Sequence, residues 1–120
     1  MERQRIGQNA EDAAVGFLES QGLTVLLRNY RRRLGELDIV AREGDILVIA
    51  EVRTRSSGRF GGAAASVGTR KQAKLLRAAA QLLQQRKDLA KYRVRFDVIV
   101  VHHPLSPEVR VEWIKHAFAA

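Results

Sequence analysis

Two carboxylates and an arginine in the middle of the sequence have the types and spacing of a metal-dependent site. Asp38 lies in the stretch "GELDIVAR", and Glu51 and Arg53 follow in "AEVRTR". Carboxylate oxygens are ligands that Mg²⁺ prefers, and a guanidinium group binds phosphate well. These residues could therefore hold Mg²⁺ next to a phosphate group, provided that the fold brings them together.

A hairpin between these residues would do so. The dipeptide Gly44-Asp45 is typical of a two-residue turn, and the apolar runs on either side predict strands over about 36–42 and 46–54. Counted outward from this turn, antiparallel pairing places Asp38 opposite Glu51. Like charges in opposed positions destabilise a sheet unless a cation or a donor compensates them. Arg53 lies on the same face of its strand as Glu51.

The two carboxylates could instead be ordinary charges at strand ends, paired with Arg28, Arg53 or Arg55. Structural ion pairs gather charge in the same way without any catalytic role. Two observations favour a site. The carboxylates interrupt otherwise apolar strands, and the surrounding sequence is rich in basic residues on which a phosphate backbone could dock.

The charge balance of the chain predicts a polyanionic partner. Its 120 residues include 21 Lys and Arg against 13 Asp and Glu, and the formal net charge is +8 at pH 7. Such an excess attracts nucleic acid and makes its binding salt-dependent. The sequence has no apolar run of membrane-spanning length, no secretory signal and no cysteine. We therefore expect a cytoplasmic protein that binds nucleic acid and not membranes.

The rest of the sequence predicts a single α/β domain over residues 1–120. Apolar spacing predicts a helix over about 8–21, with Asn9 as a possible N-cap and Gly22 as its stop. A short strand over 23–27 and an exposed basic connection, "RNYRRR", precede the hairpin. Both strands of the hairpin have apolar residues at positions of both parities, which predicts a mixed sheet flanked by helices on both faces.

The second half of the chain predicts another helix, a strand and a tail. Thr69 could cap a helix that runs to about 85. The core-facing residues expected in this helix are Leu76, Ala79, Ala80 and Leu83. The stretch "VRFDVIVVHH" is typical of a buried strand, and "VRVEWIKHAF" predicts a short strand that runs into a terminal helical turn. The resulting order is αβββαβ with a tail.

Basic residues bracket the carboxylates in the sequence and predict a phosphate-binding rim. They are Arg28, Arg31, Arg32, Arg33, Arg55, Arg59, Arg70, Lys71 and Lys74. Lys71 is the best candidate to reach the site from the start of a helix. A solvated basic surface explains most of these residues individually, but explains the whole set less readily. Asp97, in the middle of a strand, is expected to form a buried pair with an Arg or a Lys, with a role in the site as the alternative.

The hairpin sequence resembles the core motif of the PD-(D/E)xK nuclease superfamily, in which an Asp on one strand precedes Glu-x-Lys on the next. Over residues 7–101, the chain is similar to the YraN-type family of uncharacterised bacterial proteins. The matching stretches are "GQNAEDAAVGFLESQGL", "RNYRRRLGELDIVA", "EVRTRSSGRFGGAAASV", "KQAKLL" and "RFDVIVV". The resemblance implies a restriction-endonuclease-like αβββαβ fold, similar to that of archaeal Holliday-junction resolvases.

By position, the resemblance implies that Glu11, Asp38 and Glu51 are metal ligands and that Arg53 stands where the superfamily has Lys. All four are then candidate catalytic residues of a Mg²⁺-dependent endodeoxyribonuclease that acts on structured or branched DNA, with Mn²⁺ as a substitute metal. An Arg cannot act as a neutral base, so activation of the water would rest on the metal or on a carboxylate.

The sequence also allows other interpretations of Glu11 and of the whole protein. Glu11 is equally well explained as an acidic residue in the first turn of its helix, where the helix dipole favours it. The whole protein could be a non-catalytic nucleic-acid-binding module with a nuclease fold, or a structural protein that binds a partner. Enzymes that cut junctions work as dimers, which leaves a homodimer open.

Overall fold

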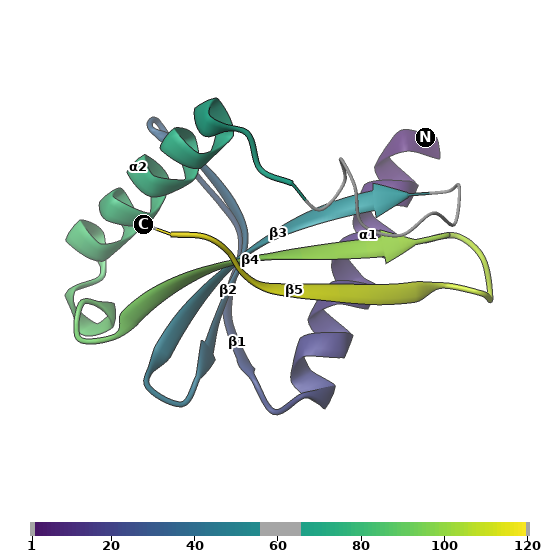
Figure 1. The fold of residues 1–120 in the computed structure, drawn as a ribbon, viewed down its shortest axis with the longest axis horizontal. Helices are drawn as coiled ribbons and strands as arrows, with labels where there is room; N and C mark the ends of the chain where they lie inside the picture. The colour runs from purple at the N-terminus through teal and green to yellow at the C-terminus, as the bar shows by residue number, and fades with distance from the viewer. Residues whose placement is uncertain (1, 56–65, 120) are drawn as a thin grey trace.

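The computed structural model describes residues 2–55 and 66–119, and these form a five-stranded sheet with helices packed on it (Figure 1). The elements are α1 (Glu2–Ser20), β1 (Thr24–Arg32), β2 (Gly35–Glu43), β3 (Ile46–Arg55), α2 (Thr69–Gln85), the short 3₁₀ helix η2 (Lys87–Leu89), β4 (Arg93–His102) and β5 (Arg110–Phe118). The strand order is β1-β2-β3-β4-β5, and β3 and β4 are the parallel pair. The predicted α/β class with an αβββαβ core is confirmed.

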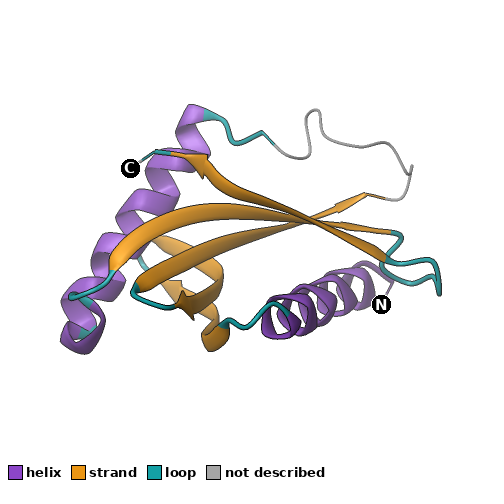
Figure 2. Cartoon of the chain, turned by 60° about the horizontal axis from the view of Figure 1, so that its bottom comes forward, coloured by secondary structure: helices purple, strands orange, loops and turns teal. Residues whose placement is uncertain are grey.

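The two faces of the sheet are covered by different helices. Along β3, Leu47 and Ile49 belong to the core beneath α2, whereas Val48 and Ala50 belong to the core beneath α1. Successive side chains of a strand point to opposite faces, so α1 and α2 must lie on opposite sides of the sheet. Figure 2 shows the twisted sheet with α2 at one end and α1 at the other. The prediction of a sheet flanked on both faces is confirmed.

Helix α1 ends as predicted but begins earlier. Gly22 has φ +92°, and the amides of Gly22 and Leu23 donate to the carbonyls of Glu19 and Leu18, which is a Schellman end. The helix already runs from Glu2, so Asn9 as its N-cap is wrong. The Glu, Arg and Gln residues of the first turns form helix readily without an apolar stripe. No helix among the described residues is long and apolar enough to cross a membrane.

Helix α2 occupies the predicted residues, but its details differ. It starts at Thr69, while the N-cap is Gly68 and makes no side-chain capping bond. The buried residues of the helix are Leu75, Ala78, Ala79 and Leu82, one position before each predicted residue. The run "LLRAAAQLL" has two neighbouring apolar stripes, and packing against the sheet selects between them.

The outer strands are longer than the sequence indicated. Strand β1 continues to Arg32, so the stretch predicted as an exposed connection is part of the sheet. Strand β5 continues to Phe118, so the predicted terminal helical turn is wrong. Ladder hydrogen bonds to the neighbouring strands stabilise these extensions beyond what local propensity indicates. Each outer strand also has one shift of register along its ladder.

The turn between β1 and β2 packs directly on α2. Gly35 has φ +144°, and a Cβ atom there would lie 3.3 Å from the Lys74 carbonyl oxygen and 3.4 Å from the Ala78 Cβ. We expect Gly35→Ala to lower the free energy of unfolding by about 1–3 kcal/mol, because both the backbone conformation and the contact disfavour a side chain. Urea denaturation followed by circular dichroism measures the change.

The matched control is Gly16→Ala in the middle of α1, where nothing lies within 4 Å of the added Cβ atom. This variant should be more stable than the parent by about 0.5–1 kcal/mol, because Ala favours helix over Gly. Equal stability of Gly35→Ala and the parent protein would contradict the close packing of the turn on α2.

Candidate functional site

The β2–β3 hairpin brings the two predicted carboxylates to the place where the strands separate. The predicted register is confirmed, and its last pair is Ile39 with Ala50. One residue further along, the Asp38 carboxylate accepts a hydrogen bond of 2.8 Å from the Val52 amide. The Asp38 side chain thus accepts the hydrogen bond that a backbone carbonyl of a neighbouring strand would otherwise accept from Val52. Asp38 and Glu51 lie beside each other where the regular pairing of β2 with β3 ends.

The electrostatics of this pair show an excess of negative charge. Burial and the neighbouring Glu51 carboxylate raise the pKa of Asp38 from its ordinary 3.8 to about 6, although the Val52 amide and the Lys71 ammonium oppose the shift. Glu51 is only 8% exposed. The compensating charge comes mainly from Lys71 of α2, whose Nζ lies 3.1 Å from Glu51 Oε2. The carboxylate pair is therefore compensated only in part.

Arg53 and the remaining arginines contribute unequally to the pair. Arg53 Nε lies 3.9 Å from Glu51 Oε2, and its Nη1 donates to the Ser66 carbonyl at 2.9 Å. Arg28 does not pair with either carboxylate of the hairpin. It binds Glu11 at 2.8 Å and Asp12 at 2.6 Å. The interpretation of these carboxylates as strand charges paired with arginines thus accounts for Glu51 in part. It does not account for Asp38.

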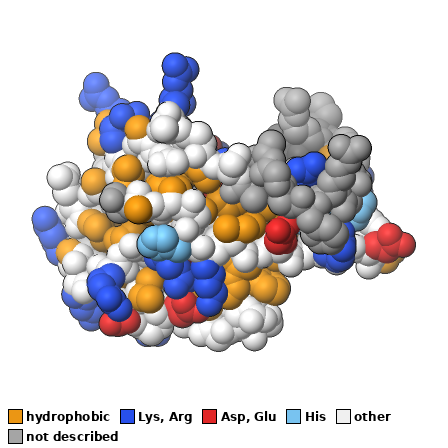
Figure 3. All heavy atoms as spheres, in the orientation of Figure 1, with side chains coloured by type: hydrophobic (Ala, Val, Ile, Leu, Met, Phe, Trp, Pro, Cys, Tyr) orange, Lys and Arg blue, Asp and Glu red, His pale blue; other side chains and the backbone are white. Residues whose placement is uncertain are grey.

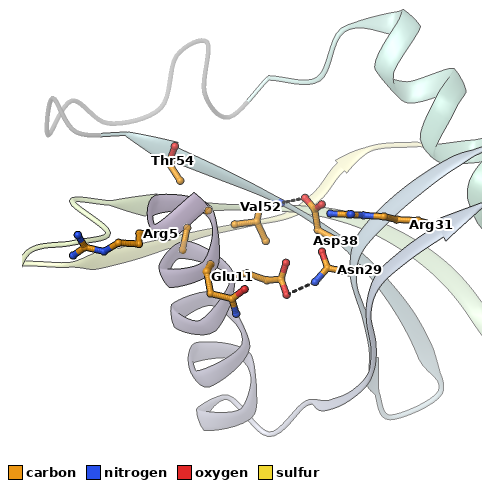
Figure 4. Close-up of a pocket in the computed structure, with 10 residues that line it drawn as sticks. Arg5, Glu11, Asn29, Arg31, Asp38, Val52 and Thr54 are labelled. Carbon is orange, nitrogen blue, oxygen red and sulfur yellow. Dashed lines mark hydrogen bonds between the residues drawn. The ribbon is translucent and has the colours of Figure 1, made fainter. Parts of the chain in front are cut away.

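Glu11 lies across a cavity from Asp38. The cavity has a volume of about 670 Å³ and is lined by α1, β1 and the separating ends of β2 and β3. Glu11 Oε1 accepts hydrogen bonds from Arg28 Nε and from Asn29 Nδ2, at 2.8 and 2.9 Å. Figure 4 shows the Glu11 and Asp38 side chains directed into the same space, with Arg31 beside Asp38. The fold thus brings Glu11 and Asp38 to one cavity, whereas Glu51, the neighbour of Asp38, is not among the lining residues.

Several residues of this cavity had no signal in the sequence. Asn29 holds Glu11 from a backbone with φ +54°, a conformation that is uncommon for residues other than glycine. Arg5 and Thr54 also line the cavity. Asn29 adjoins the basic stretch, and only its left-handed conformation, which local sequence does not reveal, turns its amide toward α1.

The other predicted basic residues that the structure describes lie in several different places. Arg33, Lys71 and Lys74 line a second cavity against α2. Arg32 binds Gln85 and lies over the Tyr30 ring. Arg70 and Arg31 are exposed, Arg55 is half-buried, and Arg59 lies outside the described residues. Figure 3 shows Lys and Arg side chains on the surface over the start of α2.

Asp97 forms the expected buried pair, with Arg95 of the same strand as its cationic partner. It is 2% exposed, and its oxygens accept bonds of 2.9 Å from Arg95 Nε and Nη2. The Trp113 indole donates to the same carboxylate at 2.8 Å, and the His116 amide does so at 3.0 Å. The predicted ion pair is confirmed. Its saturated hydrogen bonding indicates a structural role that links β4 to β5.

The two hairpin carboxylates are the residues that could together hold a cation. Among residues 2–55 and 66–119, no three His, Asp or Glu side chains are grouped closely enough to hold a metal ion. Two carboxylates suit Mg²⁺, which is often bound by one or two protein carboxylates and completes its shell with water and substrate phosphates. The like charges of Asp38 and Glu51 fit a cation between them, and Glu11 is held apart by Arg28 and Asn29.

Comparison with known sequences identifies the family. The sequence model of the uncharacterised protein family UPF0102 matches residues 10–101. The chain belongs to the UPF0102 family. The matched segment contains Glu11, Asp38, Glu51 and Arg53 and ends within β4, so β5 lies outside it. The similarity to a family of uncharacterised bacterial proteins is thereby confirmed.

Relatives of this chain match it over almost its whole length. A UPF0102 protein of Nitrosomonas europaea is 49% identical over 112 residues, which cover 93% of this chain and 92% of that protein. A UPF0102 protein of Desulforapulum autotrophicum is 44% identical over 117 residues, covering 98% and 95% of the two chains. One from Pseudomonas savastanoi is 45% identical over 116 residues, covering 97% and 94%.

Proposed function

We propose that this UPF0102 protein is a metal-dependent endonuclease that binds structured or branched DNA and cleaves it by hydrolysis of a phosphodiester bond. The observation that carries the proposal is the Asp38–Glu51 pair. Two like charges share a partly buried position at the open end of a hairpin, and Lys71 and Arg53 lie beside Glu51. Such an arrangement is costly for stability, and a bound cation would compensate it.

The residues of the chain have separate roles in this proposal. Asp38 and Glu51 would hold Mg²⁺ or Mn²⁺, which supplies a Lewis acid for the scissile phosphate and lowers the pKa of an attacking water. Lys71 lies 3.1 Å from Glu51, close enough to the pair to bind a phosphate oxygen beside it. Arg53 would stabilise negative charge on the phosphate but cannot accept a proton.

Glu11 would act from the opposite wall of the cavity. The hydrogen bonds from Arg28 and Asn29 engage one of its oxygens and fix the orientation of the carboxylate. A carboxylate fixed in this way could orient the attacking water or accept its proton. The cavity between Glu11 and Asp38, about 670 Å³ in volume, leaves space for water and a phosphate group.

A second candidate function is a DNA-binding module without catalysis. The observation that favours it is the internal pairing of the acidic residues. Lys71 pairs with Glu51 and Arg28 with Glu11, so two of the three carboxylates have cationic partners within the protein. In this alternative the net charge of +8 alone accounts for binding to nucleic acid.

A cleavage assay distinguishes the two functions. Purified protein is incubated with labelled duplex, single-stranded, flap and four-way-junction DNA in Mg²⁺, Mn²⁺ or EDTA. We expect at least one structured substrate to be cut in metal and none in EDTA. Asp38→Asn should slow cleavage by about 100-fold or more, because it removes one charge of the proposed metal site.

The matched control is Asp45→Asn, which makes the same chemical change at the turn of the same hairpin, where the side chain is 82% exposed. It should cleave like the parent protein. Equal cleavage by Asp38→Asn would identify a contaminating nuclease and contradict the proposed site. Salt-sensitive DNA binding that survives in Asp38→Asn, with no products in any metal, would favour the non-catalytic module.

A further inference from the structure

A second cavity, of about 500 Å³, lies between the β1–β2 turn and α2 and has a strongly basic lining. Its cations are Arg33 from the turn and Lys71, Lys74 and Arg77 from the helix, and its carboxylate is Glu36. Lys71, Lys74 and Arg77 follow one another at intervals of three residues, so they share one side of α2. Nothing in the sequence relates Arg77 to the hairpin carboxylates. It lies at this cavity because of the way the chain folds.

Close packing of the turn on the helix brings these charges together. The missing side chain of Gly35 allows its backbone to approach the Lys74 carbonyl and the Ala78 side chain. Arg33 therefore lines the same cavity as the helical cations, although it lies far from them in the sequence. The adjoining Leu34 is 47% exposed and gives the cavity an apolar edge.

The basic charge of the cavity is balanced by the protein only in part, through the contact of Lys71 with Glu51. Glu36 is engaged by Arg31 at 3.3 Å. Within the described residues, no carboxylate forms an ion pair with Arg33, Lys74 or Arg77. Like charges one helical turn apart repel each other, so an anion in the cavity would relieve this cost. A phosphate group is the anion that several converging Lys and Arg side chains bind best.

Lys71 connects this cavity to the hairpin carboxylates. It lines the cavity, and its ammonium group also contacts Glu51. A phosphate bound here would therefore lie within the reach of one side chain from the Asp38–Glu51 pair. Three cations of the cavity have no carboxylate partner among the described residues, and they suit a phosphate monoester, which carries about −1.5 to −2 charges at neutral pH, better than a diester with a single charge.

We propose that this cavity binds the terminal phosphate of a nucleic-acid strand. The proposal takes its macromolecule from the proposed function and adds the feature that is recognised, a phosphorylated strand end next to the carboxylate pair. Leu34 would contact the sugar or the base of the terminal nucleotide, and the cations would bind the phosphate oxygens.

Binding of matched oligonucleotides in EDTA tests this proposal without any cleavage. The probes are short single-stranded DNAs of one sequence, dye-labelled at the 3′ end, with either a phosphate or a hydroxyl at the 5′ end. Fluorescence anisotropy at low salt should show at least about fivefold tighter binding of the phosphorylated probe. The double variant Lys74→Gln, Arg77→Gln should bind both probes equally.

The control double variant, Lys87→Gln with Lys91→Gln, removes the same charge from exposed positions beyond the other end of α2. It should weaken binding of both probes alike and keep the preference. Equal affinity of the parent protein for the two probes, or no binding of either, would overturn the proposal. If deoxyadenosine 5′-monophosphate displaced the probe at concentrations as low as those at which the phosphorylated oligonucleotide binds, the assignment to a strand end would be overturned.

The outcome is separable from that of the cleavage assay. Asp38→Asn should retain the preference for the phosphorylated probe, because the cavity does not include Asp38. Metal-dependent cleavage without a preference would leave the nuclease proposal standing and reject this one. A preference that depends on Lys74 and Arg77, without cleavage of any substrate, would support the cavity and reject the nuclease.

Discussion

Asp38→Asn is expected to stabilise the protein at neutral pH, by roughly 1–3 kcal/mol in the free energy of unfolding. The folded protein raises the pKa of Asp38 from 3.8 to about 6, chiefly through burial and the charge of Glu51. Near pH 7 the carboxylate is ionised in an environment that disfavours its charge. Asn removes this charge, and its carbonyl oxygen can still accept the hydrogen bond from Val52.

The stability gained by Asp38→Asn should increase as the pH rises. Because the folded carboxyl group binds its proton more tightly than the unfolded one, its stabilising contribution is complete below pH 3.8 and is lost as the pH rises through about 6. The difference between Asp38→Asn and the parent should therefore grow between about pH 4 and pH 7.

Urea denaturation of the metal-free protein across this pH range measures the difference. Asp45→Asn provides the baseline, because its exposed carboxylate at the turn should give little change at any pH. If Asp38→Asn were less stable than the parent at neutral pH, the fold itself would compensate the charge of the Asp38 carboxylate. This result would remove the main argument for a cation at this position.

Asp97→Ala is expected to have the opposite effect and to destabilise the protein by about 3–5 kcal/mol. The carboxylate is 2% exposed and accepts bonds from Arg95, Trp113 and the His116 amide. Its removal would leave those donors unsatisfied and would leave the half-buried Arg95 with Glu43 as its remaining partner at 2.9 Å. Loss of a buried acceptor is costly, because each donor left without a partner keeps the full cost of its desolvation.

Thermal melting and urea denaturation measure this loss, with Asp88→Ala as the control. Asp88 pairs with Arg86 on the surface, with a side chain that is 62% exposed, so its removal should have little effect on stability. A cost for Asp97→Ala similar to that of the control would contradict a structural role for the buried pair.

The central part of the fold could be predicted from local sequence. The Gly44-Asp45 turn determines the register of the hairpin, and this register places Asp38 near Glu51. The extent of the outer elements could not be predicted in this way. Strand β5 is a continuous strand because β4 offers it hydrogen-bonding partners, and the buried stripe of α2 is set by contacts with the sheet.

The part of the candidate site that lies within the hairpin could likewise be predicted from the sequence, and the part that depends on tertiary contacts could not. Asp38 and Glu51 are neighbours through a short hairpin, so turn chemistry was sufficient to bring them together. The position of Glu11 depends on packing between α1 and β1, and its contact with Asn29 depends on a left-handed backbone. Arg77 reaches its cavity because Gly35 packs on α2. These relations arise from tertiary structure, which no local pattern encodes.

The irregular outer strands have a consequence for the behaviour of the protein at high concentration. Asn29 in β1 and His116 in β5 both have φ +54°, and each lies in an edge strand whose ladder shifts register. Carboxylates hold both positions, Glu11 through the Asn29 side chain and Asp97 through the His116 amide. A straight edge strand is a template on which other chains aggregate, and a bulged one is not. The irregularities in β1 and β5 therefore disfavour pairing of either edge of the sheet with another chain, and in β5 the irregular position is His116, whose amide donates to Asp97.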